Sequence, residues 1–321
     1  MSGPTYDELP RDAHGVATAW GLHGPDDSIG RLNLITPETV RDAVLLVRRG
    51  VSFGLDAAAD QFDPPLDDTR SAVRHRVLRG GTGAVTDLDD ALDDYFPQIS
   101  SQWDSLAHIP ARPGEFYNGR TLEDVLERGA NTIDHWVRRG VVTRGVLLDL
   151  PRARERSASS RPDTSHGSVA ISVEELEDAR VAAGVTYSAG CAIVVRTGFL
   201  DWYRRQDAAT RVALSANLAA PGLEHTEAMA RYLWDSGAAA VVSDTFATEV
   251  WPPDWTRDAR PFGFLHNVLI GQLGVAIGEL WDLEELAADC VADGVCEFLL
   301  VSAPLHVRGG IGSPANAVAI K

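Results

Sequence analysis

Apolar and polar residues alternate along this chain in blocks that predict helices and short buried strands following one another. A helical pattern begins at a Thr36 cap with Pro37 in the first helical position and ends at Gly50. A second helical pattern runs from Leu122 to Gly140. Continuous apolar runs bounded by glycine, proline or polar residues predict buried strands. The further predicted helices cover 172–184, 221–237 and 283–294, and the predicted strands cover 51–55, 142–151, 191–199, 238–245 and 296–304.

Loops are predicted where proline, glycine, serine and acidic residues cluster, at 56–70, 111–119 and 152–168. Elsewhere helices and strands alternate without an internal repeat or an abrupt change in composition. This order favours an α/β fold in which helices cover both faces of one sheet. We therefore predict an N-terminal arm of residues 1–28 that is followed by a single domain of residues 29–321.

Composition narrows the classes of partner. The chain has 321 residues, of which 45% are hydrophobic and 23% are charged, as in ordinary globular proteins. Its 46 acidic and 29 basic residues give a formal net charge of −17, so nucleic acid and anionic membrane are poor partners. The N-terminus is polar and acidic, and no stretch reaches the roughly 18 apolar residues of a membrane span. We expect a soluble, cytoplasmic protein.

The cysteines and the glycine-rich segments carry no chemistry of their own. Cys191, Cys290 and Cys296 are far from any CxxC spacing, which predicts reduced thiols. No GxGxxG motif follows a strand and no phosphate-binding GxxxxGK[ST] motif occurs, so nucleotide binding has no support. No GxSxG motif marks a serine nucleophile.

The segment QISSQWDSLAH is the first cluster of candidate chemistry. Gln98, Gln102, Asp104 and His108 are separated by even numbers of residues, so in an extended segment they project from one face. Burying two amides, a carboxylate and an imidazole is costly unless they have partners. Because aromatic and apolar residues flank them, we predict that this face lines a site.

The second cluster lies in FGFLHNVLIGQLGVAIGELWDLEEL, where His266 and Glu279 interrupt apolar runs. A lone histidine in such a run is also typical of a core residue, and that interpretation stays open. Glu279 is harder to explain that way, because carboxylates are almost never buried without a partner. Together with Asp104, these residues would form a set of three ligands suited to Zn²⁺ or Mn²⁺ with open positions for water.

At these residues the chain resembles a cyclase family that includes bacterial kynurenine formamidase and isatin hydrolase. The family motif His-x-Gly-Thr-His-x-Asp-x-Pro-x-His aligns with QISSQWDSLAH without a gap, which puts Asp104 on the motif aspartate and His108 on the last histidine. His266 and Glu279 match the downstream ligands. The phrases GVLLDLP, VVRTG and SDTFATE also resemble the family, and the likeness runs from about Ile29 to the C-terminus.

The resemblance implies a swivelling β/β/α fold with a mixed sheet and covering helices, assembly into a homodimer or homotetramer, and a small-molecule substrate. It implies a metal-dependent hydrolase of carbon–nitrogen bonds in which a metal-held hydroxide attacks a cyclic amide, an aryl formamide or a lactone. His108 would act as general base and acid, together with Asp104.

The chain departs from the family motif at both of its early histidines. Gln98 and Gln102 replace histidines, and an amide oxygen is a weaker ligand than imidazole. We therefore expect at most one divalent ion, Mn²⁺ or Zn²⁺, held by Asp104, His266 and Glu279 with Gln102 as a further ligand; a site without metal also stays open. Cys191 stands where the family has an aspartate after Gly190.

Other polar and aromatic residues are weaker candidates. Gln98, Gln102, Trp103, Tyr117 and Phe264 are predicted to contact the substrate, the aromatic ones as walls for a planar group. Asp244, at a predicted strand end, is either functional or part of a turn. We interpret His225 as an exposed residue in the first turn of a helix, and Arg74-His75-Arg76 as a solvated basic cluster.

Three functions remain in competition. The first is the metal-dependent hydrolase. The second is a metal-independent cyclase or dehydratase of a biosynthetic pathway, which would use His108 and Asp104 as acid and base. The third is a non-catalytic protein that binds a small molecule. The two glutamines motivate the second and third, because an amide can orient a carbonyl but cannot generate hydroxide.

Overall fold

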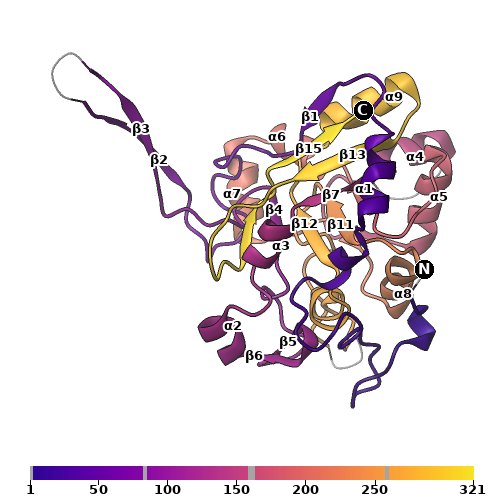
Figure 1. The fold of residues 1–321 in the computed structure, drawn as a ribbon. Coiled ribbons are helices and arrows are strands. Elements are labelled where there is room, and N and C mark those ends of the chain that lie inside the picture. Colours follow the sequence, from indigo (N-terminus) through magenta and orange to yellow (C-terminus); the bar gives the residue numbers. More distant parts are fainter. Residues whose placement is uncertain (1–2, 82–84, 158–162, 257–259) are drawn as a thin grey trace.

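A mixed sheet of nine strands runs through the part of the chain that the structure describes, in the order β1-β15-β13-β7-β9-β11-β12-β4-β14 (Figure 1). The structure is a computed structural model, and it describes residues 3–81, 85–157, 163–256 and 260–321. The strands are β1 (Ser52–Gly54), β15 (Ala317–Ile320), β13 (Glu297–Ser302), β7 (Val141–Asp149), β9 (Ala192–Arg196), β11 (Ala240–Ser243), β12 (Ala276–Glu279), β4 (Gln102–Asp104) and β14 (Gly312–Pro314).

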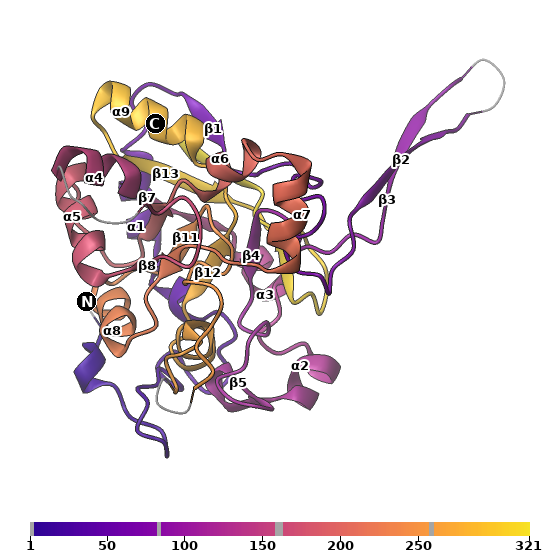
Figure 2. The same cartoon turned by 180° about the vertical axis from the view of Figure 1, so that it is seen from behind.

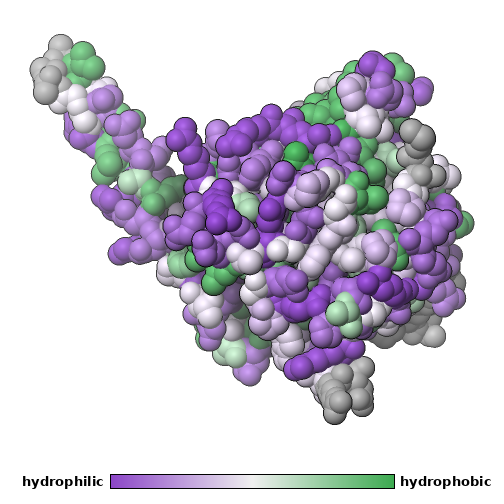
Figure 3. Space-filling view, turned by 60° about the horizontal axis from the view of Figure 1, so that its bottom comes forward, coloured by the Kyte–Doolittle hydropathy of each residue, from purple (hydrophilic) through white to green (hydrophobic). Residues whose placement is uncertain are grey.

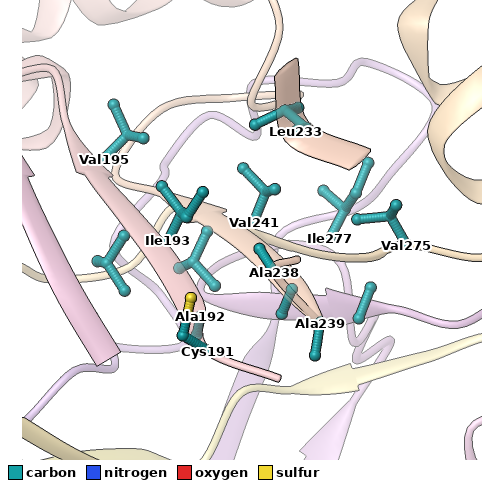
Figure 4. Packing of buried hydrophobic residues seen from close by; sticks show 14 of the residues in the cluster. Cys191, Ala192, Ile193, Val195, Leu233, Ala238, Ala239, Val241, Val275 and Ile277 are labelled. Carbon is teal, nitrogen blue, oxygen red and sulfur yellow. The ribbon is translucent and has the colours of Figure 1, made fainter. Parts of the chain in front are cut away.

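The centre of the sheet is parallel and its two sides are antiparallel. The four central strands β7, β9, β11 and β12 run parallel to one another. The strands on either side of these four pair antiparallel. The central strands are continuous apolar runs because helices and loops bury both of their faces. Ile193, Val241 and Ile277 lie side by side in register and pack with Leu233 of α8 (Figure 4). Cys191 is buried beside them as a free thiol.

Helices flank this sheet. α1 lies against β7 and β13, and α5 contacts β7 with α4 and α8 beside it (Figures 1 and 2). Among the described residues, none of the helices is long and apolar enough to cross a membrane. The helices are α1 (Pro37–Val44), α2 (Leu122–Arg128), α3 (Asp134–Arg139), α4 (Leu150–Ser157), α5 (Val173–Ala183), α6 (Phe199–Arg204), α7 (Ala208–Ala216), α8 (Glu227–Asp235) and α9 (Glu284–Asp293).

The predicted α/β class, with a mixed sheet covered by helices, is confirmed. The caps are confirmed as well, because the side chains of Thr36 and Ser172 accept hydrogen bonds from the first turns of α1 and α5. α1 nevertheless ends at Val44, before the predicted stop at Gly50. The strand predicted at 142–151 continues directly into α4, so residues 150–157 are helical where a loop was predicted from 152 onwards.

Two predicted helices have different bounds. The helix predicted from Leu122 to Gly140 is two helices, since Gly129 ends α2 in a left-handed conformation with φ of 66°. The helix predicted at 221–237 begins only at Glu227, where Thr226 is the cap. The residues before it form β10 (Gly222–Leu223), which pairs with β8 (Ala170–Ile171). α6 and α7 lie in a segment for which no element was predicted.

A long hairpin stands away from the body of the molecule in both cartoon views (Figures 1 and 2). It consists of β2 (Arg74–Arg79) and β3 (Leu88–Asp93), and its residues are exposed or half-buried. Hydrophobic side chains are visible along it in the space-filling view (Figure 3). The basic cluster that begins at Arg74 pairs with carboxylates of β3, so it is solvated as predicted. A shorter hairpin joins β5 (Glu115–Phe116) to β6 (Arg120–Thr121) within the segment predicted as a loop.

The first described residues lie against the body. Tyr6 and Ala17 are fully buried within the main core, and the indole N–H of Trp20 donates to the Gly271 carbonyl oxygen over 2.9 Å. The segment before residue 29 therefore supplies part of the same hydrophobic core. The glycine-rich C-terminal tail likewise supplies β14 and β15 to the sheet.

Candidate active site

Two neighbouring strands of the sheet place an amide between two carboxylates. β4 and β12 pair antiparallel with Gln102 opposite Glu279, so these side chains lie on the same face, and Asp104 shares that face two residues on. The Gln102 amide N–H₂ donates to Asp104 Oδ1 and to Glu279 Oε2, each over 3.2 Å. All three side chains are buried. The sheet register thus assembles the acidic half of the site.

His266 completes the group. It lies at the start of a short π-helix, Asn267–Gln272, and helices of this type are frequent at functional sites. Its Nε2 atom is 3.0 Å from Glu279 Oε1 and 3.8 Å from Asp104 Oδ2. One ligand atom from each of Asp104, His266 and Glu279 lies within 4.8 Å of the others. The structure therefore brings together the three residues that the sequence predicted to converge.

Glu249 holds His266 in place from behind. This buried carboxylate accepts hydrogen bonds from the main-chain N–H of Leu265 and of His266, the latter over 2.9 Å, and it contacts His266 Nδ1. His225 Nε2 lies 2.8 Å from its second oxygen. A carboxylate on Nδ1 leaves Nε2 as the nitrogen that faces the site, the arrangement common behind metal-binding histidines.

The charges of the group are strongly coupled. Burial and the neighbouring Asp104 carboxylate raise the pKa of Glu279 to about 7. Burial also acts to raise the pKa of Asp104, but His108 and His266 outweigh it and hold that pKa below its usual range. Burial acts to lower the pKa of His266, yet the surrounding carboxylates of Asp104, Glu249 and Glu279 raise it well above its usual range. Two carboxylates in one buried site thus require nearby positive charge.

The donor set fits a single divalent cation. Asp104 Oδ2 and Gln102 Oε1 are buried and have no hydrogen-bond partner among the described residues, although such atoms nearly always have one. Two carboxylates and an imidazole are ligands that Zn²⁺ and Mn²⁺ accept. Gln102 presents its nitrogen to the carboxylates, so its oxygen could act as a ligand only after the amide is turned over.

A cavity of about 200 Å³ opens onto this group. His108 lies at its edge, with Nε2 3.7 Å from Asp104 Oδ1, and its side chain is 22% exposed. Burial lowers the pKa of His108, and the Asp104 carboxylate opposes that shift only in part, so the imidazole is neutral near pH 7. The other residues lining the cavity are Asp67, Arg70, Ile109, Phe246, Ala247, Trp251 and Phe264.

Three of the residues predicted to contact the substrate do not line this cavity. β4 covers only three residues, so Gln98 lies outside it, with its amide against Gly312. Trp103 faces the other side of the sheet, packs edge-on against Trp281 and donates to Ser302 Oγ over 2.8 Å. Tyr117 is buried and donates to Asp27 over 3.0 Å. These three residues are structural, whereas Phe264 and Gln102 do line the cavity.

Asp244 and His225 also differ from their predicted environments. Asp244 is buried directly after β11. Its carboxylate accepts hydrogen bonds from the main-chain N–H of Thr197 and Gly198, and it does not line the cavity. Burial raises its pKa to about 6. His225 is nearly buried beside Glu249 instead of exposed in a first helical turn, since α8 begins only at Glu227 and His225 precedes its cap.

The residues that sequence analysis missed are Glu249, Asp67 and Arg70. Glu249 follows β11 by a few residues in an apolar segment, which is the signal that drew attention to Glu279. Asp67 and Arg70 lie in a loop whose course the sequence pattern does not predict. Ala247, Thr248 and Leu280, which flank Glu249 and Glu279, have positive φ values of 63°, 55° and 57°. Such strained positions cluster at functional sites.

Comparison with known proteins places this geometry in context. The family model described as Putative cyclase matches residues 69–250. A crystal structure of a novel cyclase is 30% identical to the chain, with a TM-score of 0.82, and the alignment covers 95% of this chain and 99% of that one. No curated protein matches the chain.

More distant solved structures share the fold. Isatin hydrolase A from Labrenzia aggregata, bound to benzyl benzoate, is 16% identical with a TM-score of 0.55, and the alignment covers 84% of this chain and 93% of that one. Isatin hydrolase A from Ralstonia solanacearum is 18% identical with a TM-score of 0.52, covering 89% of this chain and 98% of that one. At these identities the likeness shows the fold alone.

Proposed function

This chain belongs to the cyclase family, and on that premise we propose that it is a metal-dependent hydrolase that opens a cyclic amide, an aryl formamide or a lactone. The observation that carries the proposal is the convergence of buried Asp104, His266 and Glu279 at the end of a cavity. The fold shared with isatin hydrolases, which are named for a substrate that contains a cyclic amide, also supports it.

Asp104, His266 and Glu279 would hold one Mn²⁺ or Zn²⁺ ion, with Gln102 as a further ligand after its amide turns over. When bound, the ion supplies a Lewis acid that polarises the scissile carbonyl and lowers the pKa of a water molecule. Glu249 keeps His266 Nε2 directed at the site, because it binds the other ring nitrogen and the main chain next to it.

His108 is the residue placed to move protons. Its neutral imidazole would accept a proton from the attacking water and then donate it to the departing nitrogen or oxygen as the acyl bond breaks. The Asp104 carboxylate beside it stabilises the imidazolium that forms between these steps. The products are a carboxylate and an amine or alcohol, which balances the addition of one water molecule.

Arg70 would receive the carboxylate. It is the one Lys or Arg side chain among the residues that line the cavity, and it pairs with Asp67 at 3.4 Å and donates to the Gln98 carbonyl. A guanidinium has five N–H donors, so some remain for a negatively charged oxygen. The cavity therefore combines a place for a cation, a neutral base and an anion-binding group.

The test is a metal titration of the chelator-treated full chain, read by elemental analysis and by hydrolysis of formanilide, isatin and dihydrocoumarin. We expect one ion per chain and hydrolysis of at least one probe that chelator removes and Mn²⁺ or Zn²⁺ restores. Glu279→Gln should lose both, whereas the matched control Glu284→Gln, in the Arg196 ion pair of α9, should keep both. His108→Gln should lower kcat by about 10²–10⁴ and leave the bound ion in place. Absence of any bound ion would refute the proposal.

One observation favours a second candidate, a metal-independent cyclase or dehydratase that uses His108 and Asp104 as acid and base. The Gln102 N–H₂ group already bridges Asp104 and Glu279, so it compensates part of their charge without a cation. This candidate predicts turnover that chelator leaves unchanged and that His108→Gln abolishes. Recovery of turnover on addition of metal would exclude it.

A further inference from the structure

A second and larger depression adjoins the catalytic cavity. It has a volume of about 590 Å³ and is lined by described residues within 12–16, 109–113, 254–255 and 260–272. Ile109 and Phe264 line both spaces, so the two are neighbours across these side chains. We call the larger space the outer groove.

The sizes of the two spaces differ in a way that decides what each can hold. Small-molecule sites in proteins occupy about 300–1,000 Å³. The catalytic cavity, at about 200 Å³, is below that range and has room for the reacting group alone. The outer groove, at about 590 Å³, is within it. A substrate of ordinary size must therefore extend beyond the catalytic cavity.

The walls of the outer groove are mainly apolar, with Val16, Pro110, Pro113 and Trp255 among them. His14 and Arg260 also line the groove, and several other polar side chains in its lining are paired. Arg112 and Gln272 both donate to Asp12, and Asn267 donates to the Pro110 carbonyl oxygen over 2.6 Å. Because these paired side chains need no further hydrogen-bond partner and most of the lining is apolar, the groove favours an apolar occupant over a charged one.

Phe264 links the groove to the reaction centre. Its ring stacks on His266, with centroids 5.0 Å apart and planes at 10°, and it contacts Trp255 with centroids 5.3 Å apart. Trp255 is 62% exposed, which is unusual for so large an apolar side chain and typical of a binding surface. A group attached to the scissile bond would pass Phe264 and meet Trp255.

We propose that the outer groove binds an apolar alkyl or aryl extension of the substrate, so that the substrate is a cyclic amide or a lactone with a long apolar group. This inference rests on the proposed function and specifies its substrate class. The reacting acyl group lies in the catalytic cavity near Arg70, and the extension lies between Trp255 and the 109–113 segment. Apolar burial in the groove, rather than further hydrogen bonds, supplies the affinity for this group.

The test is calorimetric binding of straight-chain carboxylates, from butyrate to decanoate, to the full chain with and without Mn²⁺. These compounds resemble the acyl product, and their chains are flexible enough to follow the path past Phe264. We expect affinity to rise about fourfold for each methylene group that enters the groove. Trp255→Ala should flatten this dependence on chain length, and Trp255→Asp should abolish it, with butyrate binding unchanged in both. Trp202→Ala, at a tryptophan on α6 outside the groove, is the matched control and should keep the full dependence.

An affinity that does not change with chain length in the natural protein would overturn the inference, as would a dependence that both Trp255 variants retain. The proposed function fails by a different result, the absence of a bound ion and of hydrolysis. Chain-length dependence together with that absence would keep the groove as an apolar binding site and remove the hydrolase.

Discussion

Glu249→Gln tests whether a buried carboxylate outside the cavity organises the site. The two carboxylate oxygens face four nitrogen atoms: two main-chain N–H groups, His266 Nδ1 and His225 Nε2. In either orientation, a glutamine amide would direct its own N–H₂ group at two of these nitrogens. One of the two is a main-chain N–H, which cannot accept, whereas the other is an imidazole nitrogen, which can accept in the appropriate tautomer. A lost hydrogen bond to a charged group destabilises the fold by about 1.5–3 kcal/mol. Whole proteins are stable by only about 5–15 kcal/mol.

The assay is urea unfolding of the full chain, combined with titration of Mn²⁺. We expect the free energy of unfolding to fall by that amount in Glu249→Gln. We also expect the affinity for the ion to fall by about 10–100-fold, because His266 is no longer held with Nε2 toward the site. Glu284→Gln is the control, since Glu284 forms a half-buried pair with Arg196 and does not line the cavity; its affinity for the ion should not change.

A milder variant keeps the test decisive if Glu249→Gln does not fold. His225→Gln removes one neighbour of Glu249 and leaves both main-chain donors and His266 in place. It should lower the unfolding free energy by about 1–3 kcal/mol and weaken ion binding less than Glu249→Gln does. If both variants unfold like the natural protein and bind the ion with unchanged affinity, Glu249 does not organise the site and the reasoning is wrong.

Three further predictions concern the ion, pH and assembly. Mn²⁺ at about 100 times its dissociation constant should raise the unfolding free energy by about 2.7 kcal/mol, and Glu279→Gln should abolish this gain; a gain that persists in the variant would contradict the assignment of the ligand. Burial raises the pKa of Asp244 to about 6, so the folded protein favours its protonated form: stability is greatest below the unfolded pKa near 3.8 and is lost as pH rises through 6. Relative to Asp244→Asn, the natural protein should lose roughly 2 kcal/mol between pH 4 and 7 in unfolding experiments, and a constant difference would disprove this. We also expect a homodimer or homotetramer that uses the exposed hairpin, because Val77 and Leu92 share one face of it and are 61% and 51% exposed. Val77→Asp with Leu92→Asp should then sediment as a monomer, whereas Leu78→Asp, on the other face, should leave the assembly unchanged; the same sedimentation for both variants would count against the hairpin.

The parts of the fold that sequence analysis predicted are those set by local chemistry. The continuous apolar runs of β7, β9 and β11 allow no other placement than a buried sheet, and the caps of α1 and α5 satisfy main-chain N–H groups within their own first turns. The hairpin β2–β3 was missed because charged residues interrupt its apolar residues and neither strand has a regular apolar alternation. Helix ends were misplaced where a glycine such as Gly129 stops a helix early.

Some residues of the site could be predicted from the sequence pattern, and others could not. His266 and Glu279 could be picked out because each is a polar residue inside an apolar run, where burial without a partner is costly. The even spacing of Gln98 with Asp104 was misleading, because spacing orders side chains only as far as the strand extends and β4 covers three residues. His108 lies beside Asp104 although it is beyond the strand. Arg70 could not have been found, since it reaches the cavity from a loop and contacts the site through tertiary packing alone.

The position of Gln102 explains how this chain could keep a metal site after losing the family's first two histidines. The histidine at the second of those positions is replaced by an amide that lies directly across from Glu279 and beside Asp104. Its nitrogen compensates the two carboxylates when no cation is bound, and its oxygen, now without a partner, becomes available when the amide turns over. A neutral imidazole in this place has one N–H donor and could bond to only one of the two carboxylates, whereas the amide N–H₂ bonds to both. The register of β4 on β12 would therefore let a single side chain stabilise the site both without an ion and, after one rotation, with one.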